Sequence, residues 1–253
     1  MAENLVRMEH IDKFFGRVQA LDDVNFSVAR QEIVGLLGDN GAGKSTLIKV
    51  LSGALRASSG DIFVRGKRIE MRSTTDAIAA GIETIYQDSA LVTQLSIARN
   101  LFLGREPLKG PRIFNRMDAD LMEQVAGDLL KRVGIGKAIP ASTPIASLSG
   151  GERQAVAIAR AMHFDSDLII LDEPTNNLGV AETQGVLRFV RNARDSGHSC
   201  IFIAHNIHHV VQVVDRIVVL RRGRVVADDI DPKRTSIAEV ERVITGELAG
   251  VTH

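Results

Sequence analysis

The chain has 253 residues, of which 45% are hydrophobic and 25% are charged, and its 31 basic and 31 acidic side chains leave no net charge. That length suits one domain with a sizeable core. The balanced charge, the single Tyr and the lack of Trp argue against a nucleic-acid groove built on phosphate contacts and base stacking, so we expect no nucleic-acid partner.

Membrane and secretion signals are also missing from the sequence. No apolar stretch approaches the roughly 18 residues of a membrane-spanning helix, and the N-terminus has no hydrophobic signal core. The single cysteine, Cys200, lies in an apolar run. This is typical of a structural, buried thiol in a reducing compartment.

The predicted elements indicate an α/β protein. Strand-like runs separated by turns at 4–30 and 61–70 predict an antiparallel β layer. Later strands alternate with helices, which is typical of a mostly parallel sheet. From Asp88 to about Asp165 the strand pattern gives way to helical runs and to loops rich in Pro and Gly. The predicted core strands are 33–37, 82–86, 168–172, 199–204 and 216–220, two of the helices are 118–132 and 236–248, and the loops are 107–116 and 134–144.

A glycine-rich loop follows the strand at 33–37 and precedes a helix expected from Gly43 to Leu51. It fits the pattern G-x-x-x-x-G-K-[ST], in which backbone N–H groups and the helix dipole surround a phosphate. Lys44 would reach the β- and γ-phosphates, and the Ser45 hydroxyl would ligate Mg²⁺. A turn that merely starts a helix is the alternative, which the strand–loop–helix context disfavours. The candidate nucleotide-binding residues here are Gly38, Asn40, Gly41, Ala42, Gly43, Lys44, Ser45 and Thr46.

A second segment suited to phosphate begins at Ser149 and opens another helix. Ser149 and Glu152 have the spacing of a capping box, which is a purely structural device. Gly150 and Gly151 are harder to explain in that way, because each disfavours a helix by about 1 kcal/mol relative to Ala. Without side chains, the first-turn N–H groups can approach an anion closely. One nucleotide needs one such cradle, so the second suggests a protein that works as a pair.

Two carboxylates end the apolar strand at 168–172. In open α/β folds ligands bind at the carboxyl edge of the sheet, where this acidic end would lie. Asp172 is therefore a candidate Mg²⁺ ligand, and Glu173 a candidate for polarising the attacking water. Two solvated acids in a turn before Pro174 would be the preferred interpretation if the run stood alone.

The order of these motifs resembles that of an ATP-binding-cassette ATPase over nearly the whole chain. The resemblance rests on the phosphate loop, on Leu148-Ser149-Gly150-Gly151-Glu152-Arg153-Gln154, and on Leu171-Asp172-Glu173-Pro174-Thr175. It implies a P-loop NTPase core with a mostly parallel sheet, an antiparallel β layer and an inserted α-helical subdomain. The expected domain is a single nucleotide-binding unit at 1–253, with the core at 1–87 and 166–253 and the helical subdomain at 88–165. ATP and Mg²⁺ are the implied ligands.

Three smaller motifs are similar to those of the same family. Gln87 matches the Q-loop, where it would ligate the metal and report the occupied site to the helical subdomain. His205 matches the switch histidine, which would steady the γ-phosphate and Glu173. Phe15 stands where an aromatic ring stacks on adenine, although Phe14 is the neighbouring register. Each residue alone would be explained as an ordinary packing or surface residue. Their order along the chain favours a functional role for all three.

The segments 81–87 and 95–106 are similar to the nucleotide-binding subunits of bacterial monosaccharide importers, most of all to fructose-type members with a single cassette. This implies transmembrane permease subunits as partners, indirectly a periplasmic or extracellular solute-binding protein, and a peripheral position on the cytoplasmic face of the membrane. An importer for amino acids or polyamines, or an exporter, would share every catalytic residue. A non-transport cassette protein would normally show a second cassette or a long linker.

The family resemblance further implies a head-to-tail homodimer that sandwiches ATP. The loop at 38–46 of one copy would hold ATP, and Ser149, Gly150 and Gly151 of the other copy would cover it. Glu152 stands where Gln is usual and can still close the capping box. Gly179 stands where many members have Asp, and this removes a carboxylate expected where the two copies meet.

Overall fold

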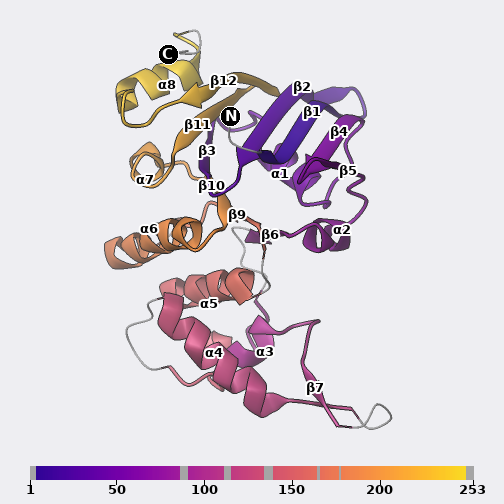
Figure 1. Ribbon diagram of the computed structural model, residues 1–253. Coiled ribbons are helices and arrows are strands. Elements are labelled where there is room, and N and C mark those ends of the chain that lie inside the picture. The colour runs from indigo at the N-terminus through magenta and orange to yellow at the C-terminus, as the bar shows by residue number, and fades with distance from the viewer. Residues whose placement is uncertain are drawn as a thin grey trace.

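The computed structural model describes residues 4–85, 91–110, 115–133, 139–163, 166–176 and 178–248 (Figure 1). Two sheets occupy one end of the molecule, and a group of helices occupies the other. An antiparallel sheet with the order β2-β1-β4-β5 contains β1 (Asn4–Phe15), β2 (Val18–Ala29), β4 (Ser59–Val64) and β5 (Lys67–Ile69). This sheet confirms the predicted antiparallel layer.

The core sheet has six strands in the order β12-β11-β3-β10-β9-β6. All neighbours are parallel except β11 and β12, which pair in an antiparallel manner. The mostly parallel sheet is therefore confirmed, with β12 as a strand that the sequence did not predict. Its strands are β3 (Ile33–Leu37), β6 (Ile82–Ile85), β9 (Leu168–Asp172), β10 (Ser199–Ile203), β11 (Arg216–Arg221) and β12 (Arg224–Ile230).

The central strands are buried on both faces, which explains their continuous apolar sequences. On β9, Ile170 faces one hydrophobic cluster and Ile169 faces another, because successive side chains alternate across a strand. The first cluster contains the antiparallel sheet and α1 (Lys44–Leu51). The second contains residues of α6 (Val180–Asp195) and α8 (Ile237–Thr245). The remaining helices by the sheets are α2 (Thr74–Ala79) and α7 (Ile207–Val210).

A third hydrophobic cluster lies away from the sheets and joins α3 (Ile97–Leu101), α4 (Ala119–Val133) and α5 (Gly150–His163). Helix α5 belongs to two clusters: Val156 and Ala159 face the helical one, whereas Ala157 and Ile158 face the sheet. Helix α5 thus connects the helical group to the sheet. The predicted division of the chain at 88–165 stays a prediction.

The predicted loop at 107–116 is wrong in part. Two short strands, β7 (Leu108–Lys109) and β8 (Arg116–Met117), pair in an antiparallel manner there. The Lys109 ammonium is bound by the carboxylates of Asp118, at 3.1 Å, and Asp120, at 2.8 Å. Two-residue strands are too short for a period-2 pattern to appear in the sequence.

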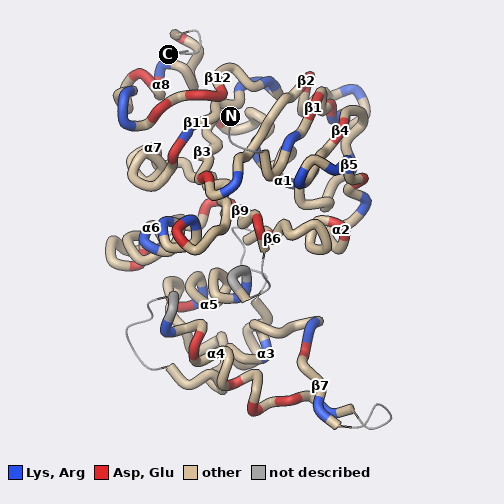
Figure 2. Tube along the Cα trace, in the orientation of Figure 1, with Lys and Arg blue, Asp and Glu red and all other residues tan. Residues whose placement is uncertain are grey.

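Charged residues of both signs are interspersed along the described chain (Figure 2). This distribution agrees with the balanced composition. Among the helices in the described ranges, none is both long enough and apolar enough to cross a membrane.

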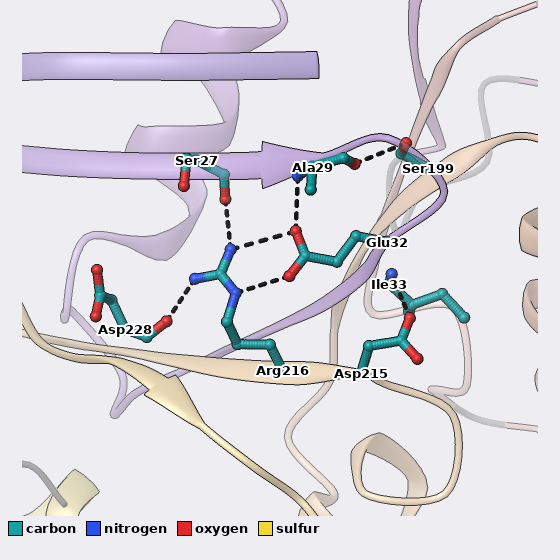
Figure 3. A network of polar contacts seen from close by, with 8 residues as sticks. All are labelled: Ser27, Ala29, Glu32, Ile33, Ser199, Asp215, Arg216 and Asp228. Carbon is teal, nitrogen blue, oxygen red and sulfur yellow. Dashed lines mark hydrogen bonds and ion pairs between the residues drawn. The ribbon is translucent and has the colours of Figure 1, made fainter. Parts of the chain in front are cut away.

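Arg216 joins the two sheets (Figure 3). Its Nε donates to Glu32 Oε1 at 2.7 Å, and one terminal nitrogen donates to the carbonyl of Ser27 on β2 at 2.8 Å. The other terminal nitrogen donates to the carbonyl of Asp228 on β12. The Glu32 carboxylate also accepts the N–H of Ala29 at 2.7 Å. The guanidinium therefore holds the antiparallel sheet against β11 and β12.

We expect Arg216→Met to lower the free energy of unfolding by about 3 kcal/mol, because removing one partner of a largely buried ion pair leaves the other charge uncompensated. The side chains of Arg216 and Glu32 are only 17% and 15% exposed. Urea unfolding followed by circular dichroism measures the loss. Arg224→Met is the matched control, since Arg224 and its partner Asp22 are 64% and 31% exposed and such pairs contribute about 1 kcal/mol or less. Equal losses in the two variants would contradict this role of Arg216.

Candidate ATP site

Three neighbouring parallel strands bring three of the predicted motifs to one edge of the sheet. Strand β10 lies between β3 and β9. The glycine-rich loop begins where β3 ends, His205 follows the end of β10, and β9 ends at Asp172. The register pairs Ile203 of β10 with Asp172 of β9, so His205 and Asp172 lie at the ends of neighbouring strands. Motifs far apart in the sequence therefore meet at the carboxyl edge.

The loop after β3 needs glycine at two positions. Gly38 has φ +148, and a Cβ there would lie 2.2 Å from the carbonyl oxygen of Leu220. Gly43 has φ +108, and a Cβ there would lie 2.9 Å from the carbonyl oxygen of Ala20. The loop therefore fits closely between β11 and β2, and its backbone takes a conformation that other residues rarely adopt.

The side chain of Lys44 is held by carbonyl groups of the glycine-rich loop that precedes it. Its Nζ donates to the carbonyl of Gly38 at 2.5 Å and to that of Asp39 at 3.0 Å. Burial lowers the pKa of Lys44, and the negative charges of Glu173, Asp39 and Asp172 act in the opposite direction. A phosphate group would be an anionic partner for this ammonium and would bind it more strongly than the neutral loop carbonyls do.

A pocket of about 190 Å³ lies directly over this loop. The exposed Ser45 lies on its wall, as do Glu173 and His205 from the neighbouring strands. None of Ser149, Gly150 and Gly151 lines the pocket. The described residues that line it are Ala20, Asp39, Asn40, Gly41, Ala42, Gly43, Lys44, Ser45, Thr46, Glu173 and His205.

Glu173 is oriented by two side chains. His205 Nε2 lies 2.7 Å from Glu173 Oε1, and the Asn176 amide donates to the other carboxylate oxygen. The backbone of Glu173 has φ +53, which is uncommon for a residue with a side chain. Its N–H still donates to the Ile203 carbonyl at 2.9 Å, so the chain turns sharply only after the strand ladder is complete. The carboxylate is thus aimed into the pocket and held there.

Asp172 has the character expected of a metal ligand. Burial raises the pKa of Asp172, and the adjacent charge of Glu173 raises it further. A divalent cation beside Asp172 would offset both effects. Mg²⁺ takes oxygen ligands and usually shares them with substrate phosphates, so a carboxylate at Asp172 and a hydroxyl at Ser45 fit it.

The predicted capping box at the start of α5 is confirmed. The Ser149 N–H donates to the Glu152 carboxylate at 2.7 Å, and the Glu152 N–H donates to the Ser149 hydroxyl at 3.3 Å. Ser149 and Gly150 are exposed, and a Cβ on Gly150 would meet no atom within 4 Å. The first turn of α5 is therefore open to a ligand or to another molecule.

The hairpin of β1 and β2 carries the two neighbouring phenylalanines. Phe15 pairs with Val18, and a register shift between Lys13 and Phe14 interrupts the regular alternation beside Ala20. Ala20 lines the phosphate pocket, and the choice of Phe15 over Phe14 as the ring that stacks on adenine stays a prediction. Phe15 and Val18 are 48% and 67% exposed, so both offer apolar surface to a ring.

One predicted site residue lies outside the described part of the chain. Gln87 falls between the end of β6 at Ile85 and residue 91, where the described residues resume. Sequence reasoning missed Ala20, which lines the pocket, and Asn176, which binds Glu173. Ala20 lies in a strand-like run far from the glycine-rich loop in the sequence, and Asn176 carried no signal beyond its nearness to Glu173.

Comparison with known proteins identifies the family. The model for the ABC transporter family matches residues 21–176. The chain is 42% identical to the fructose import ATP-binding protein FrcA of Rhizobium meliloti, over 96% of the chain and 95% of that protein. It is 41% identical to the xylose/arabinose import ATP-binding protein XylG of Sulfolobus acidocaldarius, over 98% of the chain and 96% of that protein.

Solved structures share the fold. An ATP-binding cassette of an ABC transporter in its ADP conformation superposes with a TM-score of 0.81 and 24% identity, over 96% of this chain and 95% of that one. A dimeric ATP-binding cassette in a post-hydrolysis state with ADP and Pi superposes with a TM-score of 0.74 and 22% identity, over 88% of this chain and 97% of that one. By its family match and its near full-length relatives, the chain belongs to the ABC transporter family and is an ATP-binding cassette of that family.

Proposed function

We propose that the chain is the ATP-hydrolysing subunit of a bacterial monosaccharide importer, bound peripherally at the cytoplasmic face of the membrane. The observation that carries the ATPase assignment is the meeting of Lys44, Glu173 and His205 around one pocket at the edge of the sheet. The names of two nearly full-length relatives specify import of fructose and of xylose or arabinose. Separate permease subunits would form the path, and a solute-binding protein would deliver the sugar to them.

In this proposal the chain's own residues arrange the hydrolysis. Backbone N–H groups of the loop at 38–46 and the Lys44 ammonium hold the phosphates, and Phe15 stacks on adenine. Glu173 accepts a proton from the attacking water, since His205 and Asn176 fix its carboxylate. A bound Mg²⁺, held by Asp172, Ser45 and Gln87, would neutralise charge on the β- and γ-phosphates.

A second copy of the chain completes the site in this proposal. Ser149, Gly150 and Gly151 are absent from the wall of the phosphate pocket in their own chain, although Ser149 and Gly150 at the start of α5 are exposed. A head-to-tail pair would bring them over the ATP of the partner. ATP would then favour the closed pair through contacts that hydrolysis removes, which is the differential interaction that a conformational change requires. A dimeric cassette with ADP and Pi of the same fold supports this arrangement.

The sugar assignment is tested by reconstitution. In proteoliposomes with the permease and binding protein encoded by neighbouring reading frames, the chain should hydrolyse ATP several-fold faster when fructose, xylose or ribose is supplied with the binding protein, because binding energy then favours the closed pair. Lys44→Ala in the same liposomes is the control for background ATPase activity. Stimulation by an amino acid or a polyamine, with none by any monosaccharide, would contradict the proposal.

A further inference from the structure

One side chain, Glu182, lies between two glycines that belong to different elements. A Cβ on Gly151, the second residue of α5, would lie 2.1 Å from Glu182 Cγ and 3.0 Å from Glu182 Cβ. A Cβ on Gly179, the N-cap of α6, would lie 2.4 Å from Glu182 Oε2. The aliphatic part of Glu182 therefore rests on Gly151, and its carboxylate lies over Gly179.

The backbone at Gly179 does not itself require glycine. Its φ of −67 and ψ of 171 are accessible to any residue, so what the glycine provides is space. Glu182 lies in the first turn of α6, where the helix dipole favours a carboxylate. The carboxylate of Glu182 thus takes the place that a side chain at 179 would occupy.

This contact connects the two halves of the proposed site. On one side it touches the start of α5, where Ser149 and Gly150 are exposed. On the other side it touches the segment that leads back to Asn176, whose amide binds Glu173. A shift of α5 relative to α6 would change the distance between the phosphate-binding turn of α5 and the catalytic segment of the same chain. In the proposed symmetric pair each copy gives its α5 turn to one ATP site and its catalytic segment to the other, so that distance would link the two sites.

We infer that Glu182 is a positioning residue that holds the phosphate-binding turn of α5 in register with the catalytic segment before α6. This inference rests on the proposed function, since it concerns a turn that acts on the ATP of a second copy. Glu182 works by its length and placement. A glutamine at this position reaches both glycines, whereas an aspartate or an alanine keeps only the atoms beside Gly151 and does not reach Gly179.

The test compares turnover, ATP affinity and thermal midpoint for purified variants. Glu182→Ala should lower kcat roughly tenfold or more, because misplacement by about 1 Å can reduce rates by up to about a hundredfold. ATP affinity and the thermal midpoint should match those of the wild type, since the loop at 38–46 is untouched. Glu182→Gln should restore kcat, whereas Glu182→Asp should not. Glu123→Ala, at an exposed glutamate on α4, is the matched control and should leave kcat unchanged.

Gly179→Ala provides an independent check on the contact itself. Its methyl group would displace the Glu182 carboxylate and should lower kcat as Glu182→Ala does. Once the carboxylate is gone, no other described atom outside the chain neighbours lies within 3.9 Å of the methyl group, so Gly179→Ala should have no further effect in the Glu182→Ala background. Additive losses would overturn the inference, as would a Glu182→Ala variant with wild-type kcat or one whose kcat loss follows a lowered thermal midpoint.

The dimer assay separates this inference from the function on which it rests. In the Glu173→Gln background, ATP should produce a dimer on size exclusion, and adding Glu182→Ala should raise the ATP concentration required roughly tenfold. An unchanged ATP requirement would overturn the role of Glu182 and leave the proposed pair intact. If Glu173→Gln alone stays monomeric with bound ATP, both proposals are wrong.

Discussion

Glu173→Gln is expected to bind ATP with wild-type affinity and to hydrolyse it about 10²- to 10⁴-fold more slowly, the contribution of a positioned general base. Glutamine keeps the shape of the side chain and can still pair with Asn176 and His205, which contact both carboxylate oxygens. It cannot accept the proton of water. ATP should therefore persist at the site and trap a dimer, which single-turnover assays and size exclusion would measure together.

The control for this variant is the same substitution at a nearby acid. Glu241 is an exposed residue of α8 and lines a cavity of about 400 Å³ that also contains His205 and the start of the phosphate loop. Glu241→Gln removes a negative charge from the same neighbourhood without touching the reacting atoms, so turnover should remain close to that of the wild type. A Glu173→Gln variant that keeps more than about a tenth of wild-type turnover would assign the base elsewhere.

A mixture of two inactive chains should recover activity. Lys44→Ala should weaken ATP binding about ten- to a hundredfold, because it removes charge-assisted hydrogen bonds worth about 1.5–3 kcal/mol. Ser149→Arg should block the open turn of α5. A heterodimer of the two variants places both defects at one composite site and leaves the other site whole, so mixing should restore part of the turnover that each variant lacks alone. ATPase assays at a series of mixing ratios measure this recovery.

The matched control for the first chain is Lys131→Ala, at an exposed lysine on α4. It should bind ATP normally and should show no gain on mixing. If the Lys44→Ala and Ser149→Arg chains stay inactive at every ratio while each folds, the phosphate sites are complete within one chain and the head-to-tail arrangement is wrong. Unchanged ATP binding in Lys44→Ala would contradict the assignment of the lysine itself.

The sequence predicted best those strands that are buried on both faces. Strands β3, β9 and β10 are covered on both faces, so each appears as a short apolar run. Strand β12 was missed because, among the described strands, it pairs with β11 alone, and its exposed Asp228 and Asp229 disfavour a strand assignment. The hairpin of β7 and β8 was missed because two-residue strands carry no periodicity.

The same distinction applies to the candidate site. Lys44 and Asp172 could be predicted because a loop pattern and a strand end locate them on the sheet edge. The partners of Glu173 could not be assigned fully, since the hydrogen bond from Asn176 depends on the left-handed turn at Glu173 itself. Glu182 gave no signal at all. Its position depends on two glycines, Gly151 in α5 and Gly179 at the N-cap of α6. These come close to Glu182 only once the two helices are packed.

Cys200 has a practical consequence for measuring motion in this molecule. The thiol is fully buried on β10, and burial raises its pKa to about 12, so it forms almost no thiolate at neutral pH. Because it is the only cysteine in the sequence, the wild-type chain already provides an unreactive background for maleimide dyes. One cysteine introduced at the exposed Leu121 and another at the exposed Lys67 would carry a fluorophore pair on the helical group and on the antiparallel sheet. Energy transfer between them would follow how these two parts move as ATP binds and is hydrolysed.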